Sequence, residues 1–177
     1  MPAVTPGTHT SFASLKQVKA GLLDIGYAEA GPARGPMVIC LHGWPYDIHS
    51  FVDVAPLLAA QGYRVIVPYL RGHGPFDNPD YAAIVIHNYR WRLSLADGER
   101  RYDALEKRLA ARPAIKVPTI TLDAERDPFT APPGDGSSYR NMFTGPYEHR
   151  TLEGIGHNLP QEAPTAFAQA VVDVDHF

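Results

Sequence analysis

Two side chains in the last third of the chain could form a general base. Asp127 follows the apolar run of residues 117–123, and His157 lies in a loop that contains glycine, residues 154–158. A histidine that a carboxylate orients can take a proton from water, and this step is typically worth about 10²–10⁴-fold in rate. Asp127 and His157 are therefore the first candidates for catalytic residues.

A second set of candidates lies in the first third of the chain. His42, Gly43, Trp44 and Pro45 come directly after the apolar run of residues 37–41. A metal site is a less attractive interpretation of the eight histidines. Only His42, His73 and His157 could converge from distant positions, and neither an H-E-x-x-H nor an H-x-H spacing is present, so we expect no metal and no other cofactor.

The first half of the chain has the pattern of a sheet with one covering helix. Residues 37–41 and 63–68 are continuous apolar runs of the kind found in strands covered on both faces. The helix between them, residues 51–61, has Ser50 as a plausible N-cap and Gly62 as its stop. A strand, helix and strand in this order predict a right-handed crossover and a parallel sheet, preceded by strands at residues 11–20 and 22–28.

The second half alternates helices and strands. We expect an amphipathic helix over residues 81–95, a second helix over 102–111, strands over 117–123 and 147–152, and a final helix over 164–174. The chain length suits one domain. We divide it into an N-terminal part of an α/β core (1–75), a helical segment (76–112) and a C-terminal part of the core (113–177), which carries Asp127 and His157.

Three of these segments together resemble the α/β-hydrolase superfamily, and more narrowly its epoxide hydrolase and haloalkane dehalogenase branch. They are His42-Gly43-Trp44-Pro45, the strand end Leu122-Asp123-Ala124-Glu125-Arg126-Asp127, and the loop around His157. The resemblance implies that the Trp44 backbone N–H donates to an oxyanion, that Asp127 is the acid and that His157 is the base. The acid precedes the histidine in the chain, as expected of this fold.

One part of the family pattern is missing. The family carries a strand ending in a nucleophile elbow, its helix, and a second strand and helix between the two blocks found here. This segment and most of the lid amount to on the order of a hundred residues. No Gly-x-Ser-x-Gly or Asp-centred elbow occurs in the sequence, and the nearest string, residues 134–138, follows two prolines and reads as a loop. We therefore assign no nucleophile.

Other residues have weaker assignments. Tyr89 resembles the lid tyrosine that epoxide hydrolases direct at the epoxide oxygen, and packing is an equally good interpretation. Cys40, Ser50 and Asp47 flank the His42 loop and are the first candidates for an unrecognised nucleophile. Cys40, within an apolar run, reads as a buried structural thiol.

Removing the central strands predicts a gap on the order of 10–15 Å between residues 37–41 and 117–123. The two half-sheets could close and pair directly, a second chain could supply strands, or the fold could be unstable because apolar edges are exposed. Pairing with a second copy leaves the helices uncrowded, so we favour a homo-oligomer over a monomer.

Composition excludes several partners. The chain is 45% hydrophobic and 20% charged with a net charge of −3, and its Lys and Arg residues are scattered, so we expect no nucleic acid as partner. The N-terminus lacks the pattern of a signal peptide, and no apolar stretch approaches the roughly 20 residues of a membrane helix. A single cysteine cannot form an internal disulfide. These features favour a cytoplasmic protein with no membrane partner.

Two functional hypotheses follow. The first is a shortened α/β-hydrolase with a mostly parallel sheet, related to epoxide hydrolases, that acts on a small-molecule epoxide, ester or related compound and is impaired or inactive without its nucleophile. The second is a non-catalytic binding or oligomeric assembly module on the same scaffold. A third interpretation is that the sequence omits a segment between Pro75 and Asp77.

Overall fold

A four-stranded sheet forms the N-terminal half of the molecule. The computed structural model describes residues 11–74, 80–129 and 136–177. β1 (Leu15–Ala20) and β2 (Leu23–Ala30) form a hairpin, and Gly21, with φ of 63°, adopts the left-handed conformation that its tight turn requires. β2 also pairs antiparallel with β4 (Arg64–Pro68), and β4 pairs parallel with β3 (Met37–Ile39). All four predicted strands are present, in the order β1-β2-β4-β3.

The predicted crossover helix begins later than expected. A 3-10 turn, η1 (Ile48–Phe51), precedes α1 (Val54–Ala60), and Gly62, with φ of 90°, follows the helix end as predicted. Ser50 as N-cap is wrong, because Ser50 lies inside η1. The Asp47 carboxylate instead caps η1 by accepting from the His49 backbone N–H. An Asp immediately before the turn can reach its free N–H groups, whereas Ser50 is already part of it.

The hydrophobic core belongs mainly to this N-terminal half. Ile48, Leu58, Val54 and Val65 are fully buried, and α1 covers one face of the sheet. The C-terminal half contributes Ala168 to the same cluster, with three partly buried neighbours from its last helix. The described residues therefore share one core, built on β2, β4 and α1.

The C-terminal half contains a parallel pair of strands, as predicted. β5 (Thr119–Ala124) and β6 (Tyr147–Leu152) are in register, with Thr119 opposite Tyr147 and Ala124 opposite Leu152. A short helix, α4 (Ser137–Arg140), precedes β6, and α5 (Leu159–Glu162) and α6 (Pro164–Val174) follow it. α6 contacts both α1 and β5, and α5 contacts η1, so these helices join the two halves.

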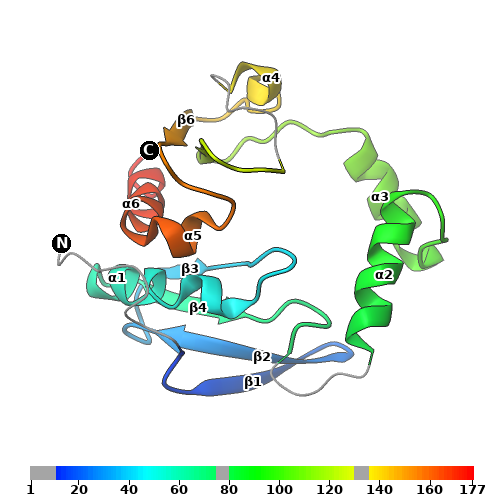
Figure 1. Ribbon diagram of the computed structural model, residues 1–177, viewed down its shortest axis with the longest axis horizontal. Helices are drawn as coiled ribbons and strands as arrows, with labels where there is room; N and C mark the ends of the chain where they lie inside the picture. Colours follow the sequence, from blue (N-terminus) through cyan, green and yellow to red (C-terminus); the bar gives the residue numbers. More distant parts are fainter. Residues whose placement is uncertain (1–10, 75–79, 130–135) are drawn as a thin grey trace.

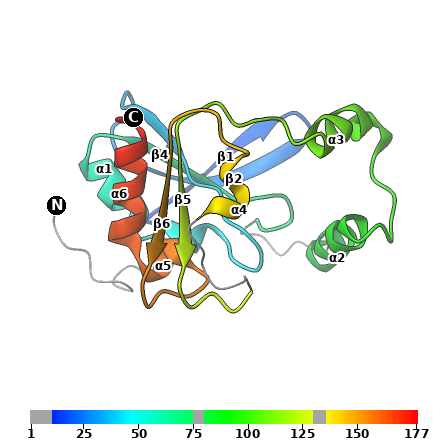
Figure 2. The ribbon, with the colours of Figure 1, turned by 90° about the horizontal axis from the view of Figure 1, so that it is seen from above.

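The helical segment lies apart from both sheets. It contains α2 (Tyr81–Arg92), the turn η2 (Arg100–Tyr102) and α3 (Asp103–Ala110), which stand away from the strands (Figure 2). The predicted amphipathic character of α2 is wrong, because none of its residues is buried and its apolar side chains are distributed around the axis. The boundary predicted at residues 75 and 76 lies outside the described residues.

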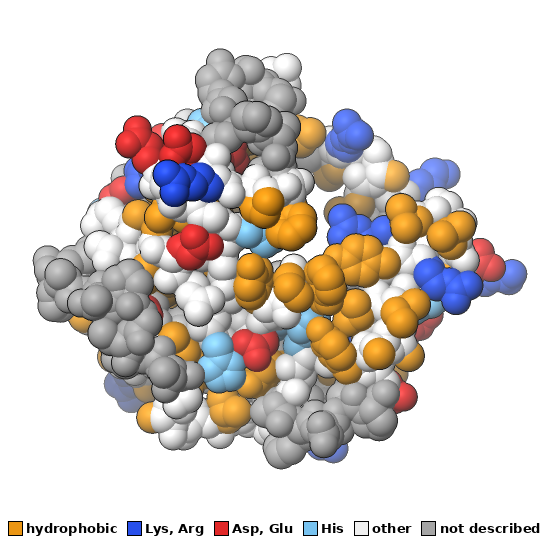
Figure 3. Space-filling model, viewed as in Figure 1, with side chains coloured by type: hydrophobic (Ala, Val, Ile, Leu, Met, Phe, Trp, Pro, Cys, Tyr) orange, Lys and Arg blue, Asp and Glu red, His pale blue; other side chains and the backbone are white. Residues whose placement is uncertain are grey.

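The two sheets do not pair with each other in the described part of the chain. The halves and the helical segment follow one another around an open centre (Figure 1). The space-filling view shows a hollow at the centre of this face, with hydrophobic side chains along much of its rim (Figure 3). Direct closure of the two half-sheets, one of the three expected solutions, is therefore not the one adopted. No helix among the described residues has the length and hydrophobicity needed to cross a membrane.

Candidate active site

Asp127 and His157 form the pair that the sequence predicts. Nδ1 of His157 lies 2.9 Å from Oδ2 of Asp127, and the other carboxylate oxygen accepts from the Phe129 backbone N–H at 2.8 Å. Because a carboxylate only accepts, Nδ1 donates, and Nε2 is then left with a lone pair. The Asp127 side chain is 9% exposed and the His157 side chain 34%. A buried acid thus orients a ring that solvent and ligands can reach.

Glutamate side chains hold the histidine loop in place. Glu125 accepts from the Gly154 N–H at 2.6 Å, and Glu162 accepts from the N–H groups of Gly156 and Asn158 at 2.7 and 3.1 Å. Sequence reasoning assigned no role to either glutamate. Their positions close to Asp127 and His157 in the sequence could have indicated a supporting role. However, no residue spacing identifies a carboxylate that binds backbone N–H groups.

His42 is buried and both of its ring nitrogens are occupied. Nε2 accepts from the Leu70 backbone N–H at 3.0 Å, so Nδ1 carries the proton and donates to the Gly43 carbonyl at 3.2 Å. Its ring lies 4.9 Å from that of His73. Such a histidine connects the loops after β3 and β4 and has no free nitrogen for a ligand. We assign His42 a positioning role.

Gly43, Trp44 and Pro45 are exposed, as a substrate-binding loop requires. The Trp44 side chain is 50% exposed, and its ring lies 5.4 Å from the ring of Tyr89 at 75°. Tyr89 is itself on α2, so this contact connects the helical segment to the loop after β3. The structure brings Tyr89 and Trp44 together. This contact is compatible with both roles proposed for Tyr89, proton donor and packing residue.

The loops of the two half-sheets meet despite the gap between the strands. The ring of Tyr46, which follows the His42 loop, lies 5.9 Å from that of His157. A second contact joins the same two loops, because Asn158 Nδ2 donates to the buried Ser50 hydroxyl at 3.1 Å. Sequence reasoning missed both contacts, since they join residues about 110 positions apart. They place the predicted base beside the predicted oxyanion loop.

The three alternative nucleophiles are poorly suited to attack. Burial raises the pKa of the Cys40 thiol to about 12, so the reactive thiolate is suppressed at neutral pH. Ser50 is buried and accepts from Asn158, and Asp47 binds the His49 ring and backbone. The described residues therefore place no activated nucleophile beside His157.

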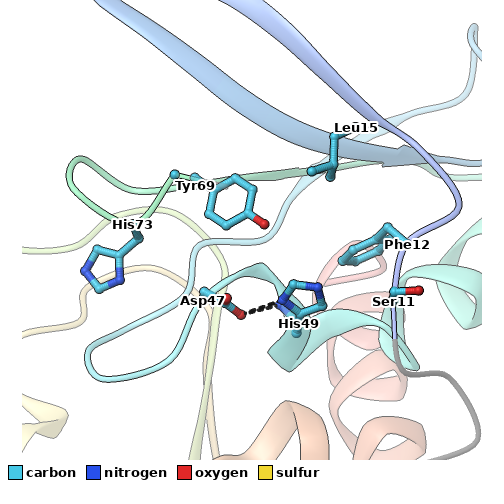
Figure 4. Close-up of a pocket in the computed structure, with 8 residues that line it drawn as sticks. Ser11, Phe12, Leu15, Asp47, His49, Tyr69 and His73 are labelled. Atoms are coloured by element: carbon cyan, nitrogen blue, oxygen red, sulfur yellow. Dashed lines mark hydrogen bonds and ion pairs between the residues drawn. The ribbon is translucent and has the colours of Figure 1, made fainter. Parts of the chain in front are cut away.

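A pocket of about 490 Å³ borders the His42 loop on the side of Asp47 and His73. Within it the Asp47 carboxylate lies 2.9 Å from Nδ1 of the His49 ring, with Tyr69 and His73 nearby (Figure 4). Burial and then the neighbouring His42 lower the pKa of His73, and burial raises that of Tyr69. Neither Asp127 nor His157 lines the pocket. Its lining residues are Ser11, Phe12, Leu15, Asp47, His49, Tyr69, His73 and Gly74.

Over residues 11–74, 80–129 and 136–177, no three His, Cys, Asp or Glu side chains are grouped as metal ligands. Of the three histidines considered from the sequence, His42 has both nitrogens engaged and His157 is bound to Asp127.

Comparisons with known proteins identify relatives of this chain. Residues 36–94 match the family model described as the alpha/beta hydrolase fold. A haloalkane dehalogenase of Mycobacterium marinum is 44% identical over 57 residues, which are 32% of this chain and 19% of that protein. Epoxide hydrolase 3 of Siraitia grosvenorii is 42% identical over 50 residues, 28% of this chain and 16% of that protein. These matches span about a fifth of each relative.

A solved structure matches over nearly the whole chain. It is described as a candidate epoxide hydrolase of Klebsiella pneumoniae, is 33% identical with a TM-score of 0.85, and the match covers 94% of this chain and 98% of that one. Epoxide hydrolase A of Mycobacterium thermoresistibile has a TM-score of 0.66 at 16% identity, with 91% and 97% covered, which shows a shared fold.

Proposed function

Because this chain belongs to the α/β-hydrolase family, in the branch related to epoxide hydrolases and haloalkane dehalogenases, we propose that it binds a small molecule with an electrophilic carbon. The substrate classes that we propose are epoxides and esters. We further propose that His157, oriented by Asp127, activates water for their hydrolysis. The observation that carries this proposal is the 2.9 Å contact between the two side chains, with the opposite ring nitrogen left to accept a proton.

Aromatic side chains around His157 favour an apolar or aryl substrate. Phe129 lies 4.9 Å from the His157 ring and is 78% exposed, and Tyr46 lies on the same ring at 5.9 Å. Trp44 and Tyr89 form a further aromatic pair from the loop after β3 and from α2. Exposed aromatic groups of this kind bury apolar ligand surface while their edges remain available to polar atoms. The Trp44 N–H is the proposed donor to the developing oxyanion.

The rate of this reaction is expected to be low. We assign no nucleophile among the described residues, so this proposal includes no covalent route, and general-base activation of water contributes only about 10²–10⁴-fold. An oxyanion site that holds one donor instead of two loses a further factor of about 10²–10³. We therefore propose an impaired hydrolase when the chain acts alone.

Hydrolysis of an aryl epoxide and of a nitrophenyl ester tests this function. We expect slow turnover that falls at least about tenfold in His157→Ala and in Asp127→Asn. His49→Ala is the matched control, since His49 also pairs with an aspartate at 2.9 Å but lies in the separate pocket. A rate equal in His157→Ala and in the unmodified protein contradicts the proposed base, and a rate typical of intact family hydrolases contradicts the proposed impairment.

The second candidate is a non-catalytic binding module. Exposed apolar side chains on the described edge of β3 favour it, since such surfaces commonly mark contacts with other molecules. Absence of turnover together with saturable binding of an aryl epoxide, measured by calorimetry, would support this function over hydrolysis.

A further inference from the structure

The pocket beside the His42 loop contains one carboxylate and several rings. It lies between the start of β1, the turn that Asp47 caps and the loop after β4 (Figure 4). Its volume of about 490 Å³ is in the range of small-molecule sites. None of its eight described lining residues is Lys or Arg, and Asp47 is the one carboxylate among them. An anionic ligand would therefore meet the Asp47 charge with no Lys or Arg to offset it.

The Tyr69 hydroxyl is available to a ligand in this pocket. Tyr69 is 7% exposed, and the described residues give its hydroxyl no hydrogen bond. Every inaccessible side-chain nitrogen or oxygen of the described residues has a partner, so this hydroxyl must be reached from the pocket, and Figure 4 shows it directed into the space that the labelled side chains surround. Burial, and then the charge of Asp47, raise the pKa of the phenol, which keeps its proton at neutral pH. A buried phenol hydroxyl usually has a hydrogen-bond partner, which a polar ligand atom can provide.

Asp47 and His49 offer two more acceptors. The His49 backbone N–H and ring Nδ1 both donate to Oδ1 of Asp47, at 2.8 and 2.9 Å, and Oδ2 takes part in neither bond. Because Nδ1 donates to the carboxylate, Nε2 of the neutral ring is left as an acceptor. Both side chains are exposed enough for a ligand to reach them. Together with the Tyr69 hydroxyl, they place three acceptors around one space (Figure 4).

This set of groups suits a cation that carries several N–H donors. A primary ammonium group has three such donors and a charge opposite to that of Asp47, and the faces of aromatic rings attract cations. Burial, and then the neighbouring His42, lower the pKa of His73, so the neutral form of this ring is favoured at pH 7 and does not repel a cation. Phe12, whose ring lies 6.3 Å from that of His49, and Leu15 provide apolar contact for the rest of the ligand.

We propose that this pocket binds a primary ammonium ion with an apolar or aryl tail. The ammonium group lies against Asp47, Tyr69 and His49, and the tail lies against Phe12 and Leu15. The inference goes beyond the proposed function and does not depend on it, because neither residue of the general-base pair lines this pocket.

Titration calorimetry at pH 7 tests the ligand class. The probe is benzylamine, and benzyl alcohol and benzoate are its uncharged and anionic analogues. We expect saturable binding of benzylamine at least about tenfold tighter than that of either analogue, because hydrogen bonds to a charged group are the stronger ones. The absence of saturable benzylamine binding overturns the proposal, and so does equal affinity for benzyl alcohol or benzoate.

A further ligand separates a free amine from a protein side chain. Nα-acetyl-lysine methylamide presents the ammonium group as a lysine of another protein would. It should bind more weakly than benzylamine, because its polar peptide groups gain less from contact with Phe12 and Leu15. Equal or tighter binding of the lysine derivative overturns the proposed preference for an apolar tail.

Variants of the tyrosine test the location. Tyr69→Phe removes the hydroxyl and keeps the ring, and it should weaken benzylamine binding about tenfold. Tyr63→Phe is the matched control, since Tyr63 is also 7% exposed but its hydroxyl donates to Asp175 at 2.8 Å and lies outside the pocket. It should leave the affinity unchanged. Equal affinity in Tyr69→Phe and the unmodified protein, or an equal loss in Tyr63→Phe, overturns this location.

A second pair of variants tests the charge. Asp47→Asn keeps a side chain that can cap η1 and should weaken benzylamine binding more than tenfold, about the value of a hydrogen bond to a charged group. Asp24→Asn removes a carboxylate from an exposed position of β2 and should leave the affinity unchanged. Thermal melts establish that each variant is folded, and if one of the two pocket variants is not, the other decides. Unchanged affinity in folded Asp47→Asn overturns the proposal.

Discussion

The two halves of the molecule differ in how their strands are supported. β4 has two buried valines, Val65 and Val67, with α1 against it, and it lies between two other strands. β5 has one buried residue, Ala124, and one partner strand among the described residues. The N-terminal half therefore has a core of its own, whereas the C-terminal half, with Asp127 and His157, is held mainly through α6 and α5.

This difference separates stability from chemistry. Burial of apolar side chains provides most of the free energy of folding, and it is concentrated in the N-terminal half. The general-base pair depends on hydrogen bonds in the other half that Glu125, Glu162 and Asp127 accept. Loss of α6 packing should thus disorder the site before it unfolds the N-terminal sheet.

The largest expected effect concerns the thiol in the N-terminal core. Burial holds the pKa of the Cys40 thiol at about 12 in the folded state, against an ordinary value of 9.0, so labelling by iodoacetamide at pH 8 should be about 10³-fold slower than after unfolding in urea. The raised pKa also contributes stability below pH 9 that is lost as the pH rises toward 12. Rapid labelling of the folded protein would mean that the N-terminal core opens as readily as the rest.

A pair of core truncations compares the halves directly. Leu58→Ala, at a fully buried position, should lower the free energy of unfolding by about 2–5 kcal/mol. Ile120→Ala, at a partly exposed position of β5, should cost clearly less. Urea denaturation followed by circular dichroism measures both. Equal losses would show that β5 contributes to the core as much as α1 does.

The hydrogen bond between Ser50 and Asn158 measures the coupling between the halves. A double-mutant cycle with Ser50→Ala and Asn158→Ala should give an interaction free energy of about 1 kcal/mol. Val18→Ala in place of Ser50→Ala supplies the uncoupled comparison, because Val18 lies on the distant β1 strand. Additive effects of Ser50→Ala and Asn158→Ala would mean that this contact does not join the halves.

The smallest expected effect is the acid dependence of two surface carboxylates. Hydrogen bonds from Lys16 and then Arg64 lower the pKa of Glu29 on β2, and those from Gln169 and then Arg150 lower that of Asp173 on α6. A lowered folded pKa contributes stability above the unfolded value that disappears as the pH falls through the folded one. Glu29→Gln and Asp173→Asn should each flatten the loss of stability below about pH 4.5, in thermal melts from pH 6 to 3. If a variant loses stability below pH 4.5 as steeply as the unmodified protein does, the corresponding ion pair is refuted.

Much of the local structure could be predicted from residue patterns. The apolar runs that became β3, β4 and β5, and the stop at Gly62, follow from hydrophobic periodicity and from the conformational freedom of glycine. Two local details differ. Asp47, not Ser50, caps the first turn, and α2 has no buried face, because it stands away from both sheets (Figure 2).

The sequence by itself determined the family and the strands, and it singled out Asp127, His157 and the His42 loop as candidates, because each depends on residue types at short spacing. Only the tertiary structure decided that Asp127 and His157 meet, that both nitrogens of His42 are occupied, and that Tyr46 and Ser50 join the two halves. The open edge of β3 was expected from the missing central strands. The side of the strand on which its backbone groups are free was not expected. Contacts between distant segments depend on how α6 and α1 pack together, and no local pattern encodes that packing.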